Sequence, residues 1–323
     1  MTPLLKKTAA ALFALAAPFA ATPSHAQQAV AGGSMRAAPV ASPERPTWAT
    51  APTQSISAGG VDFAYRELGK HHGGTPLILL VHLAAVLDNW DPRVVDGLAA
   101  QRHVITFDNR GVGASSGSPS NSMEQMADDA ITFIQAKGCQ QVDLFGFSMG
   151  GMIAQEIALK EPDLVRKMIL AGTGPAGGEG ISSVAGVANL DLLRGLFTGQ
   201  DPKQFLFFTR TPNGIEAGKA FLKRLSERTD NRDKDITVGA YVAQLQALSA
   251  WGNKAPADLS QIRQPVLVVN GDNDRMVPTI NTHDLARRLP NSQLIIYPDA
   301  GHGGIFQFHA EFLMKALGFL AVP

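Results

Sequence analysis

Short apolar runs alternate with helix-like segments along most of the chain, and this alternation constrains the fold more than any other feature. Each run is bounded by turn residues and is apolar throughout, which is typical of parallel strands covered on both faces. The runs are Leu77–Val81, Val104–Phe107, Val142–Phe145, Lys167–Ala171, Val266–Asn270 and Gln293–Tyr297. Before them, Ala58-Gly59-Gly60 separates the strand-like stretches Gln54–Ser57 and Val61–Leu68, as a hairpin turn does. The pattern predicts an α/β fold with a mostly parallel central sheet, right-handed crossovers and helices on both faces.

The helix-like segments begin and end at recognisable signals. Ser122-Met123-Glu124-Gln125 forms a capping box that opens a helix reaching about Lys137. A second helix, Met149–Lys160, stops before Glu161-Pro162, because the residue before a proline disfavours helical backbone. Thr279–Leu289 and Phe306–Leu320 are predicted as two more.

The stretch between Ala171 and Val266 interrupts the alternation, because it contains no convincing strand. Four helical segments fill it: Leu190–Phe197, Pro202–Arg210, Ile215–Arg228 and Ile236–Ser249. A helical insertion between two strands of one sheet is expected to lie above the sheet as a cap, here over about residues 175–258. Its aromatic side chains, taken together, are expected to form one apolar wall of a pocket.

The amino terminus has the three parts of a secretory signal peptide. Lys6 and Lys7 precede the apolar run Ala9–Ala21, and Ser24-His25-Ala26 places small residues before Gln27. We therefore predict a signal peptide over residues 1–26, cleavage after Ala26, and a periplasmic or secreted protein. The apolar run is too short to span a bilayer comfortably, so no stable membrane insertion is expected after cleavage. Residues 27–53 are rich in Ala and Pro and predict a flexible arm before a folded domain over residues 54–323.

Composition excludes several classes of function. The 28 Lys and Arg residues equal the 28 Asp and Glu residues, and without a basic block a nucleic-acid partner is not expected. Cys139 is the only cysteine, so no disulfide forms within the chain, and no Cys/His cluster has metal-ligand spacing. Gly172–Gly177 matches G-x-G-x-x-G, but the following residues continue a loop where a dinucleotide site needs a helix. We expect these glycines to form a hinge into the cap, and neither a cofactor nor a metal is predicted.

Gly146-Phe147-Ser148-Met149-Gly150-Gly151 is the most informative motif, because G-x-S-x-G here joins a strand to a helix. A serine on such a sharp turn is exposed and strained, and the flanking glycines remove side chains that would clash with the neighbouring backbone. The helix amino terminus supplies free N–H groups and a positive dipole end, which favour a developing oxyanion. The context therefore predicts that Ser148 is a nucleophile.

A serine hydroxyl needs a base, and in this topology an acid and a histidine follow the serine in that order. Gly271-Asp272-Asn273-Asp274 follows one predicted strand and Gly301-His302-Gly303 follows the last one. Both lie at carboxyl ends of strands, where open α/β sheets place their sites. From spacing alone Asp274 and Asp272 both remain candidates for the acid. His82 also ends a strand, and we expect it to orient the adjacent loop rather than transfer protons.

From about Ser55 to Leu320 the chain resembles α/β-hydrolase-fold serine hydrolases, in the branch of esterases, cofactor-free haloperoxidases and carbon–carbon hydrolases. The resemblance is carried in order by His82 and its loop, Asp108–Ser115, Gly146–Gly151, Gly271–Asp274 with Val277-Pro278, and Gly301–Gly304. It implies Ser148 as nucleophile, His302 as base and Asp274 as the carboxylate that orients the base.

The same resemblance implies an oxyanion hole made by the N–H groups of Met149 and Ala84. One position departs from the family, because Leu83 stands where a glycine is usual after His82. This change is expected to alter the loop backbone and to narrow the pocket mouth. Leu83, Trp90, Phe147 and Phe207 are the predicted pocket residues, with Trp90 packing beneath the loop.

These features predict a secreted or periplasmic serine hydrolase that cleaves a carboxylic ester, thioester or lactone through an acyl-enzyme. The expected partner is a small hydrophobic ester-like substrate, since the cap is apolar. Two alternatives remain open: the same triad used by a perhydrolase or a carbon–carbon hydrolase, and a non-catalytic binding protein that keeps the fold. The sequence does not indicate an oligomeric state.

Overall fold

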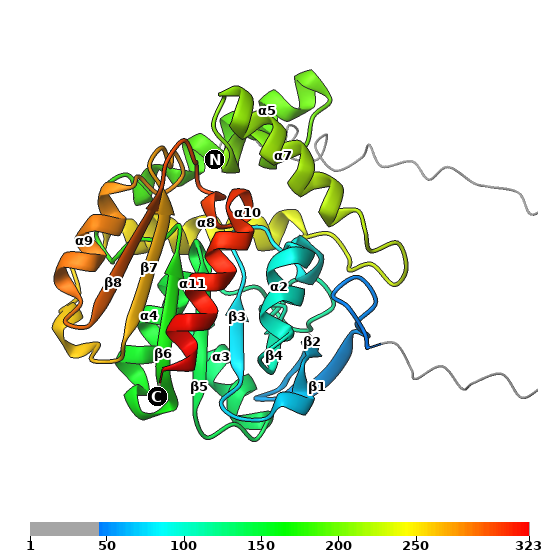
Figure 1. Cartoon of the computed structure of the whole chain (residues 1–323), viewed down its shortest axis with the longest axis vertical. Coiled ribbons are helices and arrows are strands. Elements are labelled where there is room, and N and C mark those ends of the chain that lie inside the picture. The colour runs from blue at the N-terminus through cyan, green and yellow to red at the C-terminus, as the bar shows by residue number, and fades with distance from the viewer. Residues whose placement is uncertain (1–44, 323) are drawn as a thin grey trace, which may run out of the picture. The chain divides into compact units, whose positions relative to one another are not determined.

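The central sheet of the computed structural model, which describes residues 45–322, has eight strands and confirms the predicted α/β architecture (Figure 1). The strands are β1 (Gln54–Ala58), β2 (Val61–Leu68), β3 (Leu77–Leu80), β4 (Val104–Phe107), β5 (Val142–Phe147), β6 (Val165–Ala171), β7 (Val266–Gly271) and β8 (Ser292–Tyr297). Each predicted strand is present, and its ends differ from the prediction by at most two residues. The predicted signal peptide and residues 27–44 of the predicted arm lie outside the described residues.

The order of the strands reverses at β3, in the middle of the sheet. Strands lie in the order β1-β2-β4-β3-β5-β6-β7-β8, and all pairs from β4 to β8 are parallel. From β3 the chain runs first to β4 on one side and then to β5 on the other. The carboxyl ends of strands beside such a reversal are where open α/β sheets bind ligands.

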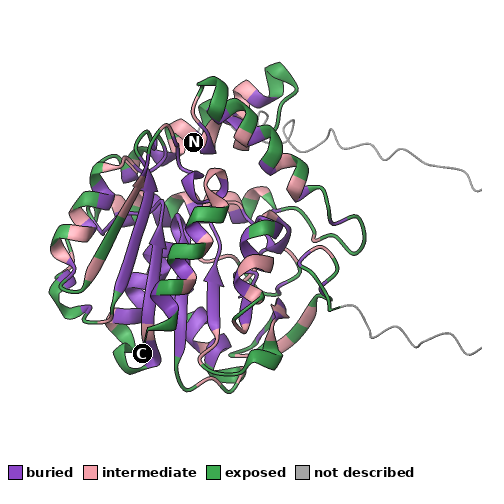
Figure 2. Ribbon diagram, in the orientation of Figure 1, coloured by how far each residue is buried: buried purple, intermediate pink, exposed green. Residues whose placement is uncertain are grey.

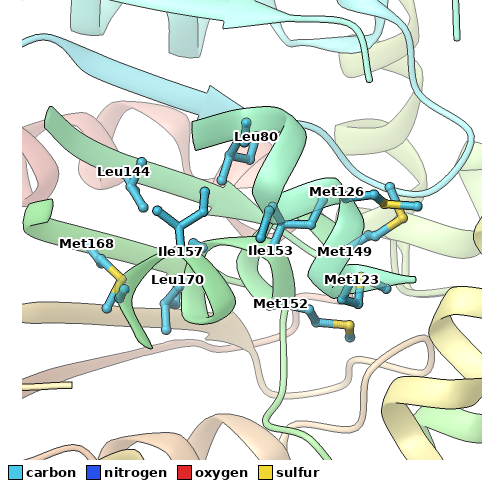
Figure 3. Close-up of a cluster of buried hydrophobic side chains, with 14 of the residues drawn as sticks. Leu80, Met123, Met126, Leu144, Met149, Met152, Ile153, Ile157, Met168 and Leu170 are labelled. Atoms are coloured by element: carbon cyan, nitrogen blue, oxygen red, sulfur yellow. The ribbon is translucent and has the colours of Figure 1, made fainter. Parts of the chain in front are cut away.

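Helices cover both faces of the sheet, and two hydrophobic clusters fill the spaces between them. One cluster contains side chains of α3, α4 and α9, and the other contains side chains of α2 and α11. Figure 2 shows the inner strands β3 to β7 buried along nearly their whole length, whereas the edge strands β1 and β8 are partly exposed. Figure 3 shows α4 side chains packed on β3, β5 and β6. The helices are α2 (Pro92–Ala99), α3 (Met123–Ala136), α4 (Met149–Lys160), α9 (Ile280–Arg288), α10 (Gly304–Gln307) and α11 (His309–Ala321). Short 3₁₀ helices are η1 (Lys70–His72), η2 (Leu87–Asn89), η3 (Pro162–Leu164), η4 (Ile181–Ser183) and η5 (Leu259–Gln261).

Outside the insertion between β6 and β7, two helical features differ from the sequence prediction. Helix α2 was not predicted, although Asp91 caps it by accepting a hydrogen bond from the Arg93 N–H and Pro92 occupies its first turn. The predicted helix Phe306–Leu320 is divided into α10 and α11, because Phe308 between them leaves helical backbone (φ −104°, ψ 35°).

The insertion between β6 and β7 is helical, as predicted, and lies over the carboxyl ends of the strands (Figure 1). It contains α5 (Val184–Thr198), α6 (Lys203–Phe207), α7 (Pro212–Leu225) and α8 (Val238–Asn253). Ion pairs fasten it to the core: Arg224 lies 2.6 Å from Asp91, and Arg275 lies 3.1 Å from Asp191. We call this insertion the cap.

The sequence pattern predicts that the folded domain starts at Gln54. In the structure the domain begins earlier than this residue. Trp48 is buried, and its backbone N–H donates to Asp96 Oδ1 at 2.6 Å. The Arg66 guanidinium lies over its ring. Arg228 donates to the carbonyl of Ala51 at 2.9 Å. These long-range contacts fix residues 47–53, and such contacts cannot be recognised from an Ala/Pro-rich composition. Among residues 45–322, no helix combines the length and hydropathy needed to cross a membrane.

Candidate active site

Ser148 occupies a strained turn between β5 and α4. Its backbone has φ 57° and ψ −119°, a conformation that non-glycine residues rarely adopt. The turn is possible because its neighbours are glycines: a Cβ on Gly146 would lie 2.4 Å from the Gly150 carbonyl oxygen, and one on Gly150 would lie 2.0 Å from that of Leu80. Met149 is the first residue of α4, so its N–H lacks an intrahelical acceptor. The turn therefore combines a hydroxyl with a free backbone donor.

The structure pairs His302 with Asp274 and not with Asp272. His302 Nδ1 lies 2.7 Å from Asp274 Oδ2, and both side chains are buried. The other carboxylate oxygen of Asp274 accepts hydrogen bonds from the N–H groups of Met276 and Val277, at 2.7 and 3.0 Å. Asp272 instead accepts from Ala300 N–H at 3.2 Å. Since a carboxylate on Nδ1 fixes the tautomer of the ring, the geometry leaves Nε2 of His302 as the basic nitrogen.

Aromatic rings hold the His302 imidazole beside the serine turn. The Phe147 ring, next to Ser148 in the chain, lies 5.0 Å from the His302 ring, and the Phe207 ring of the cap lies 5.5 Å from it. A Cβ on Gly172 would lie 3.2 Å from the imidazole, so this glycine permits the close approach of the β6 loop. Residues from β5, β6, β8 and the cap thus meet at one edge of the sheet.

The loop after β3 holds one peptide group by both of its ends. His82 is buried, and burial lowers its pKa to about 3, so the ring is neutral. Its Nδ1–H donates to the Leu83 carbonyl at 2.8 Å. The N–H of the same peptide belongs to Ala84, whose φ is 62°. It donates to Gln244 Oε1 at 2.8 Å. The predicted role of His82 in orienting the loop agrees with this geometry, and the N–H predicted for the oxyanion hole is engaged by a side chain of the cap.

The four predicted pocket residues are all buried. Leu83 is 8% exposed and packs with side chains of the α3 and α4 face. Trp90 packs against Phe145 and Phe147 of β5. Phe147 has no exposed surface and supports His302 from the core side, whereas Phe207 covers the imidazole from the cap. Trp90 and Phe147 therefore shape the site from below.

Asp108 explains why the segment Asp108–Ser115 lies next to the site. Its carboxylate accepts from the Leu87 N–H at 3.0 Å and from the Ala114 N–H at 3.3 Å, which ties the loop after β4 to the loop after β3. Burial raises the pKa of Asp108 well above its usual value. A Cβ on Gly113 would lie 2.1 Å from this carboxylate. The segment serves to position the loop that carries Ala84.

The segment Gly172–Gly177 packs closely against neighbouring residues at the base of the cap. The Gly174 carbonyl accepts from Trp251 Nε1 and from Gln155 Nε2, each at 3.2 Å. The next helical residues begin only at Ile181, in η4. Beside this loop lies a cavity of about 380 Å³ lined by residues 177–179 and by α9, and its lining includes none of the three predicted catalytic residues.

Gln244 was not identified from the sequence. It is 1% exposed and lies on the inner side of α8. The sequence shows a glutamine within an apolar helical stretch, but this pattern does not indicate which N–H group the side chain contacts.

Comparison with known proteins agrees with this architecture. The sequence profile of the α/β hydrolase fold family matches residues 75–308. A solved α/β hydrolase fold protein from Chitinophaga pinensis is 39% identical, with a TM-score of 0.81 over 86% of this chain and 100% of that one. The chain is 27% identical to a protein of Mycobacterium tuberculosis named as a non-heme bromoperoxidase, BpoC, covering 76% of this chain and 93% of that protein. It is 26% identical to the pimeloyl-[acyl-carrier protein] methyl ester esterase of Nitrosomonas europaea, covering 75% and 94%. The chain therefore belongs to the α/β hydrolase fold family.

Proposed function

We propose that the protein is a serine hydrolase that cleaves an ester-type bond through Ser148, His302 and Asp274. The observation that carries the proposal is the buried 2.7 Å contact between His302 and Asp274 at the same sheet edge as the strained turn of Ser148. A nucleophile, a base and a group that orients the base are the three parts that covalent acyl transfer needs.

In the proposed reaction, Ser148 Oγ attacks the acyl carbon and its proton passes to His302 Nε2. Asp274 holds the Nδ1–H and stabilises the imidazolium that forms. The oxyanion accepts hydrogen bonds from the N–H groups of Met149 and Ala84. The tetrahedral intermediate then collapses, the bond to the leaving group breaks, and His302 protonates the departing alcohol or thiol. Water attacks the acyl-enzyme in the same manner, His302 takes its proton, and the acid leaves as Ser148 regains its hydrogen.

The proposed substrate is a small hydrophobic carboxylic ester, thioester or lactone. Phe207 and Leu83, which lie at the boundary between the cap and the core, are apolar and favour an apolar acyl group. The esterase named among the relatives acts on a methyl ester, which supports this class of bond.

Hydrolysis of 4-nitrophenyl esters graded by acyl length tests the function. The wild type should turn over the short and medium esters, and Ser148→Ala should lower kcat by about 10⁴-fold or more. Ser183→Ala is the matched control, because Ser183 lies outside the site and its side chain caps no helix. Equal activity of the wild type and Ser148→Ala would overturn the proposal, and the absence of a fluorophosphonate adduct on Ser148 would favour the non-catalytic binding protein.

A second use of the same triad is favoured by the name of the M. tuberculosis relative. In a perhydrolase, hydrogen peroxide replaces water as the acceptor of the acyl group, and the product is a peracid. Adding peroxide to the ester assay and measuring peracid against free acid distinguishes the two acceptors. Preferential peracid formation would assign the second function.

We also propose that the protein is exported and processed after Ala26. The basis is the three-part pattern of residues 1–26. Expression of the full chain followed by cell fractionation should place it outside the cytoplasm with Gln27 as its first residue. A cytoplasmic protein that keeps residues 1–26 would contradict this.

A further inference from the structure

The side chain of Gln244 is hydrogen-bonded to the N–H that the proposed reaction assigns to the substrate oxygen. Gln244 Oε1 accepts a hydrogen bond from the Ala84 N–H at 2.8 Å, and Gln244 is 1% exposed. The donor fixes the orientation of the amide, because only the oxygen of a glutamine side chain can accept a hydrogen bond. Nε2 is then left buried without a partner among residues 45–322. Such an arrangement costs free energy, so it calls for an explanation.

The peptide group that carries the Ala84 N–H cannot readily turn away from Gln244. Its carbonyl, on Leu83, accepts from His82 Nδ1–H, and the carbonyl and N–H of a trans peptide point in opposite directions. Ala84 has φ 62°, in the left-handed region that residues other than glycine rarely adopt. The Ala84 N–H is therefore held in one orientation, and in that orientation a side chain of the cap occupies it.

We propose that Gln244 is a gating residue that closes the oxyanion hole until a substrate displaces its amide oxygen. This inference rests on the proposed function, because it assigns a role within that same site. The acyl oxygen of the substrate would take the place of Oε1 at the Ala84 N–H. Only a side-chain rotation is needed, since α8 stays anchored by the hydrogen bond from Trp251 Nε1 to the Gly174 carbonyl.

The gate would make the proposed hydrolysis selective among substrates. A substrate gains the Ala84 hydrogen bond only by breaking the one that Gln244 makes, so weakly bound esters are disfavoured. A net hydrogen bond of this kind corresponds to about a two- to tenfold change in an equilibrium. Removing the amide should therefore make Ser148 more reactive by about that factor. A glutamate at the position would hold the N–H more strongly, and its charge would oppose the oxyanion.

Phosphonylation of Ser148 by a small alkyl fluorophosphonate, followed by intact mass, tests the gate. Gln244→Met keeps the unbranched shape without either amide atom and should raise the second-order rate constant about two- to tenfold. Gln244→Glu should lower it. The matched control is Gln204→Met, because Gln204 is a buried cap glutamine that bonds the Ile215 carbonyl within the cap. It should leave the rate constant unchanged, and thermal unfolding of each variant reports on folding.

The outcomes separate the gate from the proposed function. If the wild type and Ser148→Ala are equally unlabelled, the proposed function fails and the gate with it. If Ser148 is labelled but both Gln244 variants react at the wild-type rate, the gate alone is overturned. A slower reaction of Gln244→Met also overturns the gate, because it would mean that the amide assists the oxyanion.

Discussion

His82 Nδ1 lies 2.8 Å from the carbonyl oxygen of Leu83, and this contact holds the peptide that presents the Ala84 N–H. The ring is enclosed by Phe147 and Phe207, whose centroids lie 5.5 and 5.1 Å away. Burial lowers the pKa of His82 to about 3, so the ring keeps its Nδ1–H without a charge at neutral pH. A histidine outside the proposed triad thus holds the peptide that carries a proposed oxyanion donor.

Replacing His82 with phenylalanine should impair catalysis more than binding. The variant keeps an aromatic ring but loses the donor to Leu83, so the peptide is free to turn and the Ala84 N–H is misdirected. We expect kcat to fall by about ten- to a hundredfold, below the cost of removing an oxyanion donor entirely, with a smaller change in KM. Steady-state kinetics on a short 4-nitrophenyl ester measure the split. An unchanged kcat would show that the Leu83–Ala84 peptide needs no support from His82.

The same residue should contribute a pH-dependent term to stability. Its pKa is about 3 in the folded protein and near 6.5 when unfolded, so the unfolded state binds protons more readily. Its contribution is complete above about pH 6.5 and is lost as pH falls toward 3. Asp233 acts in the opposite sense: burial raises its pKa to about 6, so its contribution is complete below 3.8 and is lost as pH rises through 6.

Because these two contributions oppose each other, variants are needed to separate them. Urea unfolding of the wild type and His82→Phe at pH 7.5, 6 and 5 should show that the difference in unfolding free energy falls as pH falls. Asp233→Asn serves as a control for the opposing group. A difference that stays constant over this range would mean that His82 is not held neutral by burial.

The sequence predicted the strands well, because strands depend on local patterns, and the proposed residues Ser148, Asp274 and His302 follow three of those strands. Each apolar run, and the pair Gly146 and Gly150 around Ser148, can be recognised within a few neighbouring residues. The cap can be recognised because its segment lacks strand-like runs. Spacing favoured Asp274 but left Asp272 as a rival, since the choice depends on which carboxylate turns toward His302. Gln244 could not be found for the same reason, because its partner Ala84 lies 160 positions away.

The choice between the two carboxylates gives a matched pair of variants. Asp274→Asn keeps the shape of the side chain but no longer fixes the tautomer of His302, and we expect kcat to fall by about 10³- to 10⁴-fold. Asp272→Asn changes the same group two residues away, where it bonds the Ala300 N–H, and should change kcat less than about tenfold. Ester hydrolysis by both variants measures the difference. Similar losses in the two would contradict the assignment of Asp274.

Substitution of two glycines by alanine is expected to change the stability of the protein in opposite directions. In Gly150→Ala the new Cβ would lie 2.0 Å from the Leu80 carbonyl oxygen, so α4 must move away from β3, and we expect severe destabilisation or no folding. Gly186 lies within α5, and a Cβ added there would meet nothing within 4 Å, so Gly186→Ala should stabilise by about 0.5–1 kcal/mol. Thermal unfolding checks both. Destabilisation by Gly186→Ala would contradict the surroundings described for α5.

A buried ionic cluster joins the cap to the core and should respond sharply to the loss of one member. Arg66 is fully buried and lies 2.7 Å from Asp88 and 2.8 Å from Asp233, which belongs to the connection between α7 and α8. The N–H groups of Asp88 and Asp233 each donate to the carboxylate of the other residue, at 2.8 and 2.9 Å. Arg66→Met would leave the Asp233 carboxylate without its cationic partner, whereas Asp88 would keep the weaker pairs with Arg228 and Arg232, at 3.5 and 3.6 Å. We expect this loss to cost about 3–5 kcal/mol.

The double variant Arg66→Met with Asp233→Asn distinguishes an electrostatic cause from a packing defect. If the unpaired charge causes the loss, removing one carboxylate should restore part of the stability, because a buried ion without its partner costs more than a neutral pair. Urea unfolding gives the free energies, and limited proteolysis should locate the loosened segment between α7 and α8 in the single variant. A double variant less stable than Arg66→Met would mean that Arg66 acts through its packing on Trp48, where its guanidinium lies 5.1 Å from the ring.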